Sequence, residues 1–429
     1  MLGKLTKQIN INFEIKRIIS NAGWLLFDKF VRLMFGLLVG VWVARYLGPE
    51  TYGQLAYVVT LIGFFQVVAL LGMDTILVRD ITHDKDKAHQ ILGSAIILRL
   101  CVGFLCLVLA TIGVGIFNGT HFALLTLLAG GSLVFQCADT IDIWFQSQSQ
   151  SKRTVIAKLC SYTFTNVMRI ALILSHGPLW AFALLLSIDA LLSALALTYA
   201  YKTFRTKKKW IVTIGKSKEL ISESWPFLIS GLSIILYMRV DQVMIKNLLG
   251  EKSLGIYAAA LQFSTLWNFV PLTLSVSLAP YIARKKKENE HEYYKALANV
   301  FLIFSIIGWI ITLTISIISP FIIDFMLGTN YTDGVVVLAI HVVTNLFISL
   351  GVAQSLWIVN ERKGTFILYK SLTGLVVCGI ANMILIPLYG IKGAAISAVL
   401  SQFAASVLFN LLFAKNIFLM QLKSLCFLR

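Results

Sequence analysis

The sequence is short of charge and of proline. Charged residues make up 13% of its 429 residues, and only 7 are proline. A soluble chain has about 25% charged residues, because polar side chains must cover the outside of a water-soluble fold. Hydrophobic residues make up 58% of this chain instead. The shortage of charge excludes a soluble protein and predicts an integral membrane protein of the all-α class, covered by lipid.

Cysteine is also scarce, and the sequence contains no CxxC pair. This spacing excludes a disulfide framework, a dithiol redox motif and a cysteine metal cage. We interpret the cysteines as small apolar side chains, and we expect neither a metal nor another cofactor. They are Cys101, Cys106, Cys137, Cys160, Cys378 and Cys426.

The first 20 residues lack the apolar core and the small-residue cleavage site of a secretory signal, so no cleavage is expected. Isoleucines recur there at helical spacing, at Ile11, Ile15, Ile18 and Ile19. With basic residues between them, they predict a short helix over residues 1–20 that lies on the inner face of the membrane.

Long apolar runs fill most of the remaining chain. A membrane-spanning helix needs about 17–25 mostly apolar residues, and twelve stretches fit. The predicted spans are Trp24–Tyr46, Gln54–Met73, Gly93–Phe117, Phe122–Phe145, Val155–Leu174, Leu179–Tyr201, Trp225–Ile245, Leu254–Ile282, Leu297–Met326, Val335–Val359, Phe366–Leu388 and Gly393–Ala414.

Basic residues collect on one side of these spans. Of the 37 Lys and Arg, 28 lie at the termini or beside the loops that follow even-numbered spans, and four lie beside the other loops. Positive residues that flank spans stay in the cytoplasm, so both termini are predicted to be cytoplasmic. Most of the net charge of +17 is therefore a topology signal, and nucleic acid is not an expected partner.

The longest link between spans predicts a division into two domains. Residues 202–224 are basic and join the sixth span to the seventh. We expect them to form a cytoplasmic linker between a six-helix bundle over residues 1–201 and a second one over 225–429.

An internal repeat supports this division. Leu47-Gly48-Pro49-Glu50-Thr51-Tyr52-Gly53, after the first span, returns as Leu249-Gly250-Glu251-Lys252-Ser253-Leu254-Gly255 after the seventh. Weaker similarities relate Trp144 and Lys158 to Trp357 and Lys370. Repeats separated by an even number of spans have the same orientation, which predicts two bundles related by a pseudo-two-fold axis along the membrane normal.

No catalytic motif is complete. Gly215-Lys216-Ser217 resembles the end of a phosphate-binding loop, but the required first glycine is Trp210. In the stretch His291 to Lys295, a lysine stands where a zinc-protease helix needs its second histidine. The outward loops are also too short to hold a soluble substrate, so we do not expect an enzyme.

Ionisable residues inside the predicted spans are the strongest functional signal, since each costs about 2.5–3.5 kcal/mol on insertion scales. Asp28 and Arg32 are four apart and share one helix face, as Asp139 and Asp142 do at a spacing of three. One interpretation is that these charges only pair between helices. In that case they order the bundle and bind nothing.

The other interpretation is a water-filled cavity between the two halves that is basic at several depths. Arginine binds phosphate through paired hydrogen bonds and keeps its charge, so an anionic headgroup is the expected ligand. The candidate substrate-binding residues are Arg32, Arg169, Arg239, Lys29 and Arg99. Candidates for ion coupling or charge pairing are Asp28, Asp189, Asp241, Asp139 and Asp142. Polar groups able to bond sugar hydroxyls, or to join helices, are Gln66, Gln136, Asn166, Gln262, Asn268, His341, Asn345, Gln354 and Asn382.

The run Arg45-Tyr46-Leu47-Gly48-Pro49-Glu50-x-Tyr52-Gly53, together with Leu71-Gly72-x-Asp74 and Arg79, resembles a known family. It is similar to the polysaccharide-biosynthesis flippases (Wzx-type O-antigen transporters) of the multidrug/oligosaccharidyl-lipid/polysaccharide (MOP) exporter superfamily. The resemblance implies a MATE-like fold in the bacterial inner membrane. It further implies transfer of an undecaprenyl-pyrophosphate-linked oligosaccharide to the outer leaflet for lipopolysaccharide O-antigen or a similar polymer. Membrane lipid and other polysaccharide assembly proteins are the implied partners.

The main alternative is a drug or cation antiporter of the same superfamily, which would share the fold. Its cavity should be net acidic, whereas five basic residues here balance five carboxylates. A membrane glycosyltransferase or polymerase would need a large outward loop. A major-facilitator transporter would carry a GxxxDRxGRR loop after the second span, and a scaffold would leave the buried charges unexplained.

Overall fold

The computed structural model describes residues 2–84, 86–204 and 209–427, with side chains from Gly23 onward. All regular structure in this part of the chain is helical, so the predicted all-α class is confirmed. Helices are the natural solution in lipid because they satisfy every backbone polar group within the segment. The predicted interfacial helix of residues 1–20 falls at the start of α1 (Leu2–Leu70), where the side chains lie outside the described part.

Ten stretches of the described chain are long and apolar enough to cross a membrane. The first, Gly23–His83, contains 61 residues and covers the first two predicted spans. The predicted fifth span, Val155–Leu174, lies in α6 (Ser151–Leu174), which is not among the ten. The protein is therefore a multi-pass membrane protein with ten to twelve apolar helices, and the count of twelve stays a prediction.

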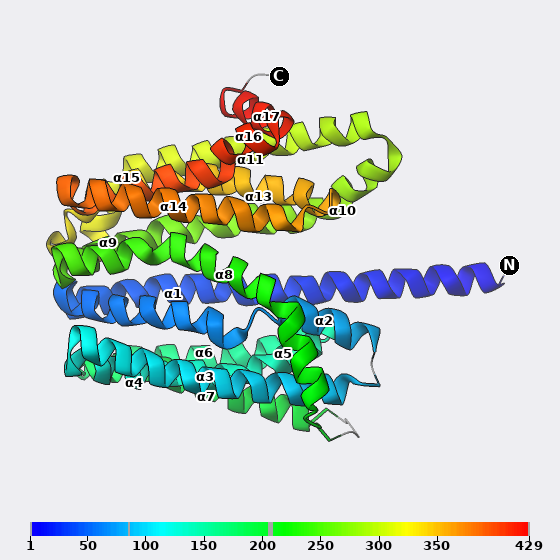
Figure 1. The fold of residues 1–429 in the computed structure, drawn as a ribbon, viewed down its shortest axis with the longest axis horizontal. Helices are drawn as coiled ribbons and strands as arrows, with labels where there is room; N and C mark the ends of the chain where they lie inside the picture. Colours follow the sequence, from blue (N-terminus) through cyan, green and yellow to red (C-terminus); the bar gives the residue numbers. More distant parts are fainter. Residues whose placement is uncertain (1, 85, 205–208, 428–429) are drawn as a thin grey trace. The chain divides into compact units, whose positions relative to one another are not determined.

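The first repeat of the glycine motif interrupts α1. Gly48 has φ 72° and ψ 169°, which are not helical values, and Pro49 follows it. The chain turns back at this point (Figure 1). A residue with φ near +70° pays a steric penalty unless it is glycine, so the glycine at this position permits the turn.

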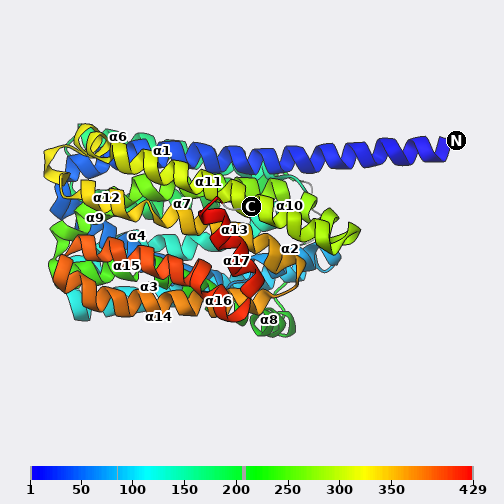
Figure 2. The ribbon, with the colours of Figure 1, turned by 90° about the horizontal axis from the view of Figure 1, so that it is seen from above.

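The chain contains two compact units, which we name the N-terminal unit (residues 1–39 and 61–228) and the C-terminal unit (residues 40–60 and 229–429). In the N-terminal unit, α3, α4 and α7 lie side by side (Figures 1 and 2). Besides part of α1, this unit contains α2 (Asp74–His83), α3 (Ala88–Asn118), α4 (Thr120–Phe135), η1 (Gln136–Ala138), α5 (Asp139–Ser147), α6, α7 (Leu179–Lys202) and the first turns of α8 (Ile214–Leu249).

In the C-terminal unit, α11 lies beside α13, and α14 beside α15. Asn289 caps α11, since its side chain accepts a hydrogen bond of 2.8 Å from the backbone of His291. Besides parts of α1 and α8, the unit contains α9 (Glu251–Thr265), η2 (Leu266–Asn268), α10 (Phe269–Glu288), α11 (Glu290–Ile322), η3 (Ile323–Leu327), η4 (Thr329–Tyr331), α12 (Gly334–His341), α13 (Thr344–Asn360), α14 (Gly364–Tyr389), α15 (Ile391–Phe403), η5 (Ala404–Leu408), α16 (Phe409–Phe413) and α17 (Lys415–Leu425).

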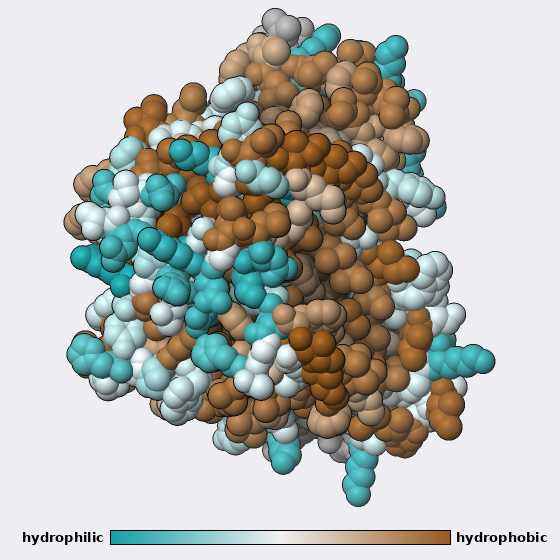
Figure 3. Space-filling view, turned by 60° about the vertical axis from the view of Figure 1, so that its left-hand side comes forward, coloured by the Kyte–Doolittle hydropathy of each residue, from teal (hydrophilic) through white to brown (hydrophobic). Residues whose placement is uncertain are grey.

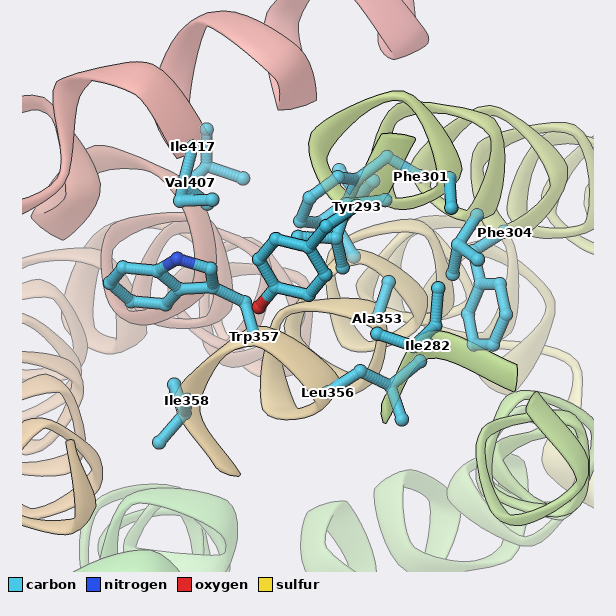
Figure 4. Packing of buried hydrophobic residues seen from close by; sticks show 14 of the residues in the cluster. Ile282, Tyr293, Phe301, Phe304, Ala353, Leu356, Trp357, Ile358, Val407 and Ile417 are labelled. Atoms are coloured by element: carbon cyan, nitrogen blue, oxygen red, sulfur yellow. The ribbon is translucent and has the colours of Figure 1, made fainter. Parts of the chain in front are cut away.

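Aromatic side chains build the core of the C-terminal unit between α11 and α13. Tyr293, Phe301 and Phe304 of α11 are fully buried and face Leu356 and Trp357 of α13 (Figure 4). Such large rings bury much apolar area in fixed geometries. This core packs α11 against α13.

The outer surface is largely apolar. Large hydrophobic side chains stay exposed along the long helices, among them Phe104 of α3, Ile317 of α11 and Met383 of α14. Apolar residues dominate much of the face shown in Figure 3. Exposed apolar area of this extent fits contact with lipid chains.

The predicted linker, residues 202–224, is only partly irregular. Residues 205–208 lie outside the described part, and α8 begins at Ile214. Between them, the backbone of Ile211 donates to the carbonyl of His89 at 3.2 Å, next to Gly93 of α3. The division of the chain into bundles at this segment stays a prediction.

Candidate functional site

A cluster of charged and polar side chains lies within the N-terminal unit on α1 and α6. The Arg32 Nε donates to Asp28 Oδ1 at 2.8 Å, as their spacing of four predicts. The guanidinium of Arg32 also lies over the ring of Tyr162, 4.8 Å from its centre. The Tyr162 hydroxyl donates to the backbone carbonyl of Arg32 at 3.1 Å. These contacts fix Arg32 in place while its Nη2 stays buried with no hydrogen-bond partner in the described chain.

Arg169 belongs to the same cluster, one helical turn from Asn166 on α6. Its Nη1 donates to the Asn166 amide oxygen at 3.3 Å, and the Asn166 nitrogen donates to the carbonyl of Tyr162. No ion pair within 4.0 Å joins Arg169 to a carboxylate in the described chain. The charges of Arg169, Arg32 and Asp189 all act on the Tyr162 phenol. The structure therefore brings two of the predicted arginines near one tyrosine.

Asp189 of α7 contributes the carboxylate of this cluster. It accepts a hydrogen bond of 3.1 Å from the Thr165 hydroxyl. Asp28 is already bonded to Arg32, so Asp189 is the predicted carboxylate of this unit that lacks a cationic partner among the described residues. Lys29, the neighbour of Asp28, is exposed on α1.

A cavity of about 390 Å³ lies within the C-terminal unit; we name it the polar cavity for the hydrogen-bonding side chains in its otherwise apolar wall. Arg239 of α8 lines it, as do several of the predicted polar residues. The charged, amide, imidazole and hydroxyl side chains of its wall are Arg239, Gln242, Gln262, Asn268, Gln402, His341, Tyr52, Tyr237, Thr265, Thr344 and Ser401.

Three of these side chains are held by neighbours. Gln262 donates to the Tyr52 hydroxyl, Gln242 accepts from Thr60 at 2.6 Å, and Nδ1 of His341 lies 2.7 Å from the Ser264 hydroxyl. Arg239 itself makes no hydrogen bond or ion pair with the rest of the described chain, although the charge of Asp241 acts on it. The cavity wall thus contains one arginine without a partner in the described chain and amide side chains whose orientation is fixed by hydrogen bonds.

Asp241 is near this cavity but does not line it. Only 3% of the residue is exposed, and it accepts hydrogen bonds from the Tyr257 hydroxyl and from the backbone of Gln242. Those donors stabilise the carboxylate. The predicted ion-coupling role of Asp241 stays a prediction.

Asp139 and Asp142 of α5 bind a residue that sequence reasoning did not assign to the site. Lys158 of α6 lies 2.7 Å from Asp139 and 2.8 Å from Asp142. The three side chains line a second cavity of about 620 Å³, to which Asp74 and Arg79 also contribute. The two carboxylates therefore form a charge-paired cluster with a lysine.

Arg99 lies beside the second cavity, because its partner Asp74 belongs to the wall of that cavity. Its side chain is 1% exposed, and its guanidinium donates to Asp74 at 2.6 Å and to Thr140 at 3.2 Å. Neither cavity contains it among its wall residues. The ion pair holds the side chain of Arg99 against Asp74 of α2, and its predicted role in substrate binding stays a prediction.

Lys370 of α14 is the counterpart of Lys158 in the C-terminal unit. Its ammonium lies 3.4 Å from the Gln354 amide oxygen, at the same sequence separation of 16 that joins Lys158 to Asp142. Gln354 is bonded in turn to Asn410, and Asn410 to Gln421 of α17. The weak repeat between the two lysines signalled this correspondence, but the sequence did not reveal the partners.

Comparisons with known proteins agree with this architecture. The sequence profile of the polysaccharide biosynthesis protein family matches residues 18–286. The capsular polysaccharide biosynthesis protein CapF of Staphylococcus aureus is 20% identical over 406 residues, which cover 94% of this chain and 100% of CapF.

Two solved structures share the fold. The lipid II flippase MurJ, in an inward closed conformation, matches with a TM-score of 0.73 and 14% identity, over 93% of this chain and 90% of that one. An inward-facing multidrug resistance MATE family transporter of the MOP superfamily matches with a TM-score of 0.73 and 17% identity, over 92% and 96%. The expected family is thereby confirmed: the chain belongs to the polysaccharide biosynthesis protein family, and it shares the fold of MurJ and of the MATE transporter.

Proposed function

We propose that the protein is a flippase that moves an oligosaccharide linked to undecaprenyl pyrophosphate from the cytoplasmic to the periplasmic leaflet. Family membership and the similarity to a capsular polysaccharide biosynthesis protein support a role in polysaccharide export. The likeness of the fold to a lipid II flippase supports a lipid-linked cargo. Pyrophosphate cannot cross hydrocarbon unaided, so a protein must replace its lost hydration.

The observation that carries this proposal is that the charged groups left without a partner among the described residues are mainly arginine guanidiniums and not carboxylates. Arg169 and Arg239 form no ion pair in the described chain, and one terminal nitrogen of Arg32 has no partner. By contrast, Asp28, Asp139, Asp142 and Asp241 all accept hydrogen bonds from charged or phenolic donors. Free guanidinium donors fit a phosphate-bearing ligand. We assign Arg32, Arg169 and Arg239 to the substrate, with Lys29 as a weaker contributor.

We further propose that twelve spans form two six-helix bundles, over residues 1–201 and 225–429, that alternate between inward and outward access. Gly48 and Gly250 support the repeat, since both have a positive φ, of 72° and 87°, and a ψ near 180°. The lysine pair at matching positions, Lys158 and Lys370, supports it too.

The cytoplasmic excess of Lys and Arg supports an inner-membrane orientation with both termini inside. Other polysaccharide assembly proteins would then receive the repeat unit on the periplasmic side. Asp189 is the carboxylate best suited to bind a coupling cation, because Thr165 is its only hydrogen-bond donor among the described residues.

The alternative function is drug or cation export, which the likeness to a multidrug transporter supports. A cationic drug would need uncommitted carboxylates, and Asp189 is the only one of the five predicted carboxylates that lacks a cationic or phenolic donor in the described chain. The unpaired arginines favour an anionic cargo.

The deciding experiment is deletion of the gene in a strain that makes the polysaccharide. We expect lipid-linked repeat units to accumulate on the inner leaflet and surface polysaccharide to disappear. Unchanged surface polysaccharide would rule out the flippase assignment. Drug sensitivity of the same deletion strain tests the alternative directly.

A further inference from the structure

The polar cavity of the C-terminal unit differs in chemistry from the arginine cluster of the N-terminal unit. The N-terminal cluster places two guanidinium groups, of Arg32 and Arg169, near one tyrosine. The C-terminal cavity contains one arginine and four amide side chains: Gln242, Gln262, Asn268 and Gln402. A pyrophosphate calls for several cationic donors, whereas amides are neutral groups that both donate and accept. The two sites therefore suit different parts of a ligand.

The cavity also holds hydrogen-bonding capacity that the protein does not use. The Asn268 amide oxygen is buried and has no partner in the described chain. Arg239 likewise forms no hydrogen bond there. Buried polar groups are normally satisfied, so an unpartnered acceptor and an unpartnered donor in one cavity indicate that a ligand or ordered water completes them.

The remaining amides are oriented and not free to rotate. The Gln262 nitrogen donates to Tyr52, which leaves its oxygen for another donor. The Gln402 nitrogen donates to the Ser406 hydroxyl at 3.1 Å, which leaves the same capacity. The volume of about 390 Å³ lies within the range of about 300–1,000 Å³ of small-molecule sites.

We propose that this cavity is a glycan subsite, which binds the hydroxyl groups of one or more sugar residues through the Asn268, Gln262 and Gln402 amides and the Arg239 guanidinium. The inference rests on the proposed function and adds that two separate sites bind different parts of the substrate. The N-terminal arginines bind the phosphate-bearing carrier, and the C-terminal cavity binds the sugar. Each sugar hydroxyl donates to an amide oxygen or accepts from a nitrogen, which is the pattern that the wall offers.

Gly40 provides a variant that moves one amide without removing it. A Cβ at residue 40 would lie 2.7 Å from the Gln262 amide oxygen, and all three atoms nearest to it belong to the Gln262 side chain. Gly40→Ala therefore displaces the end of a flexible side chain and leaves the backbone in place. It separates loss of the subsite from loss of the fold.

The experiment measures binding to the purified full-length protein in lipid nanodiscs. The probe is the lipid-free repeat unit released by mild acid from the lipid-linked intermediates of the producing strain. We expect saturable binding to the wild type and an affinity about three- to tenfold lower for Asn268→Leu, Gln262→Leu and Gly40→Ala. Asn360→Leu is the matched control, because Asn360 bonds to its own helix at 2.7 Å and lies outside the cavity.

Two results would overturn the subsite. Wild-type affinity in all three cavity variants is one, and competition between inorganic pyrophosphate and the repeat unit at this cavity is the other. An unchanged unfolding temperature for Gly40→Ala keeps the test valid if Asn268→Leu fails to fold. Failure of the flippase assignment would look different, because the gene deletion would then leave surface polysaccharide intact whatever the binding data show.

Discussion

Gly53 and Gly255 occupy equivalent positions in the two copies of one turn motif, and their backbones lie against each other inside the C-terminal unit. A Cβ on Gly53 would lie 3.0 Å from the Gly255 nitrogen, and a Cβ on Gly255 would lie 2.9 Å from the Gly53 nitrogen. Each would also collide with a carbonyl oxygen of the other turn, that of Glu251 or of Pro49. The absence of a side chain at these two glycines is what permits the contact.

We predict that Gly53→Ala or Gly255→Ala destabilises the protein by about 1–3 kcal/mol or more, because the colliding atoms are backbone and cannot rotate away. The measurement is the unfolding temperature of the purified protein in detergent. Gly63→Ala is the matched control, since nothing lies within 4 Å of a Cβ at that position of α1. Equal unfolding temperatures for the three variants would show that the contact between the two turns does not contribute to stability.

Lys158 forms ion pairs with two carboxylates, so its replacement should lower the stability of the protein. We predict that Lys158→Met destabilises the protein by about 2–4 kcal/mol, since it leaves Asp139 and Asp142 facing each other without a cation. We expect a loss of stability near the lower end of this range, because the side chain of Asp139 is 36% exposed and partly hydrated. The triple variant Lys158→Met, Asp139→Asn, Asp142→Asn should recover most of the loss. Lack of any recovery would mean that Lys158 acts through packing.

Replacement of Lys370 should not lower the stability of the protein as replacement of Lys158 does. Its contact is with the neutral Gln354 at 3.4 Å, so Lys370→Met leaves no carboxylate without a partner. We predict a change in unfolding temperature near zero or a small rise, because a desolvated cation is replaced by an apolar chain of similar length. Loss of export in a Lys370→Met protein of normal stability would reveal a functional cation. A drop in stability as large as that of Lys158→Met would contradict the difference between the two repeats.

The local features of the fold were predictable from the sequence, since they depend on neighbours in the chain. Gly48 and Gly250 occupy equivalent places in the repeated motif, and both have positive φ. The spacing of Asp28 and Arg32 predicted their hydrogen bond. In each case the interacting atoms are within one helical turn, where geometry follows directly from sequence separation.

The partners of the other charges were not predictable. Lys158 lies near the start of the predicted span Val155–Leu174, and it binds two aspartates 16 and 19 positions before it. Arg99 binds Asp74, which lies 25 positions away on another helix. Those pairs depend on how α2, α3, α5 and α6 pack, and a hydrophobic pattern alone does not specify which faces meet. The polar cavity was not predictable for the same reason, since its walls come from α1, α8, α9, η2, α12, α13 and α15.

The arginines provide the sharpest functional test, because the structure separates them into two classes. Arg169 and Arg239 form no ion pair in the described chain and the side chain of Arg32 is 29% exposed, whereas the side chain of Arg99 is 1% exposed and paired with Asp74. We predict that Arg32→Ala or Arg239→Ala abolishes polysaccharide export while the protein still inserts in the membrane. Arg→Lys should restore export partly if charge suffices, and poorly if the paired donors of guanidinium are needed.

Arg99→Met is the contrasting variant. It should lower stability by only about 1 kcal/mol, since the side chain of Asp74 is 61% exposed and stays hydrated when it loses its cation, and Arg99→Met with Asp74→Asn should retain export. The readouts are surface polysaccharide in the deletion strain and the unfolding temperature of the same variants. Full export from the alanine variants at positions 32 and 239 would assign those arginines to structure, because a guanidinium that binds the phosphate or the sugar of the cargo cannot be dispensable to its transfer.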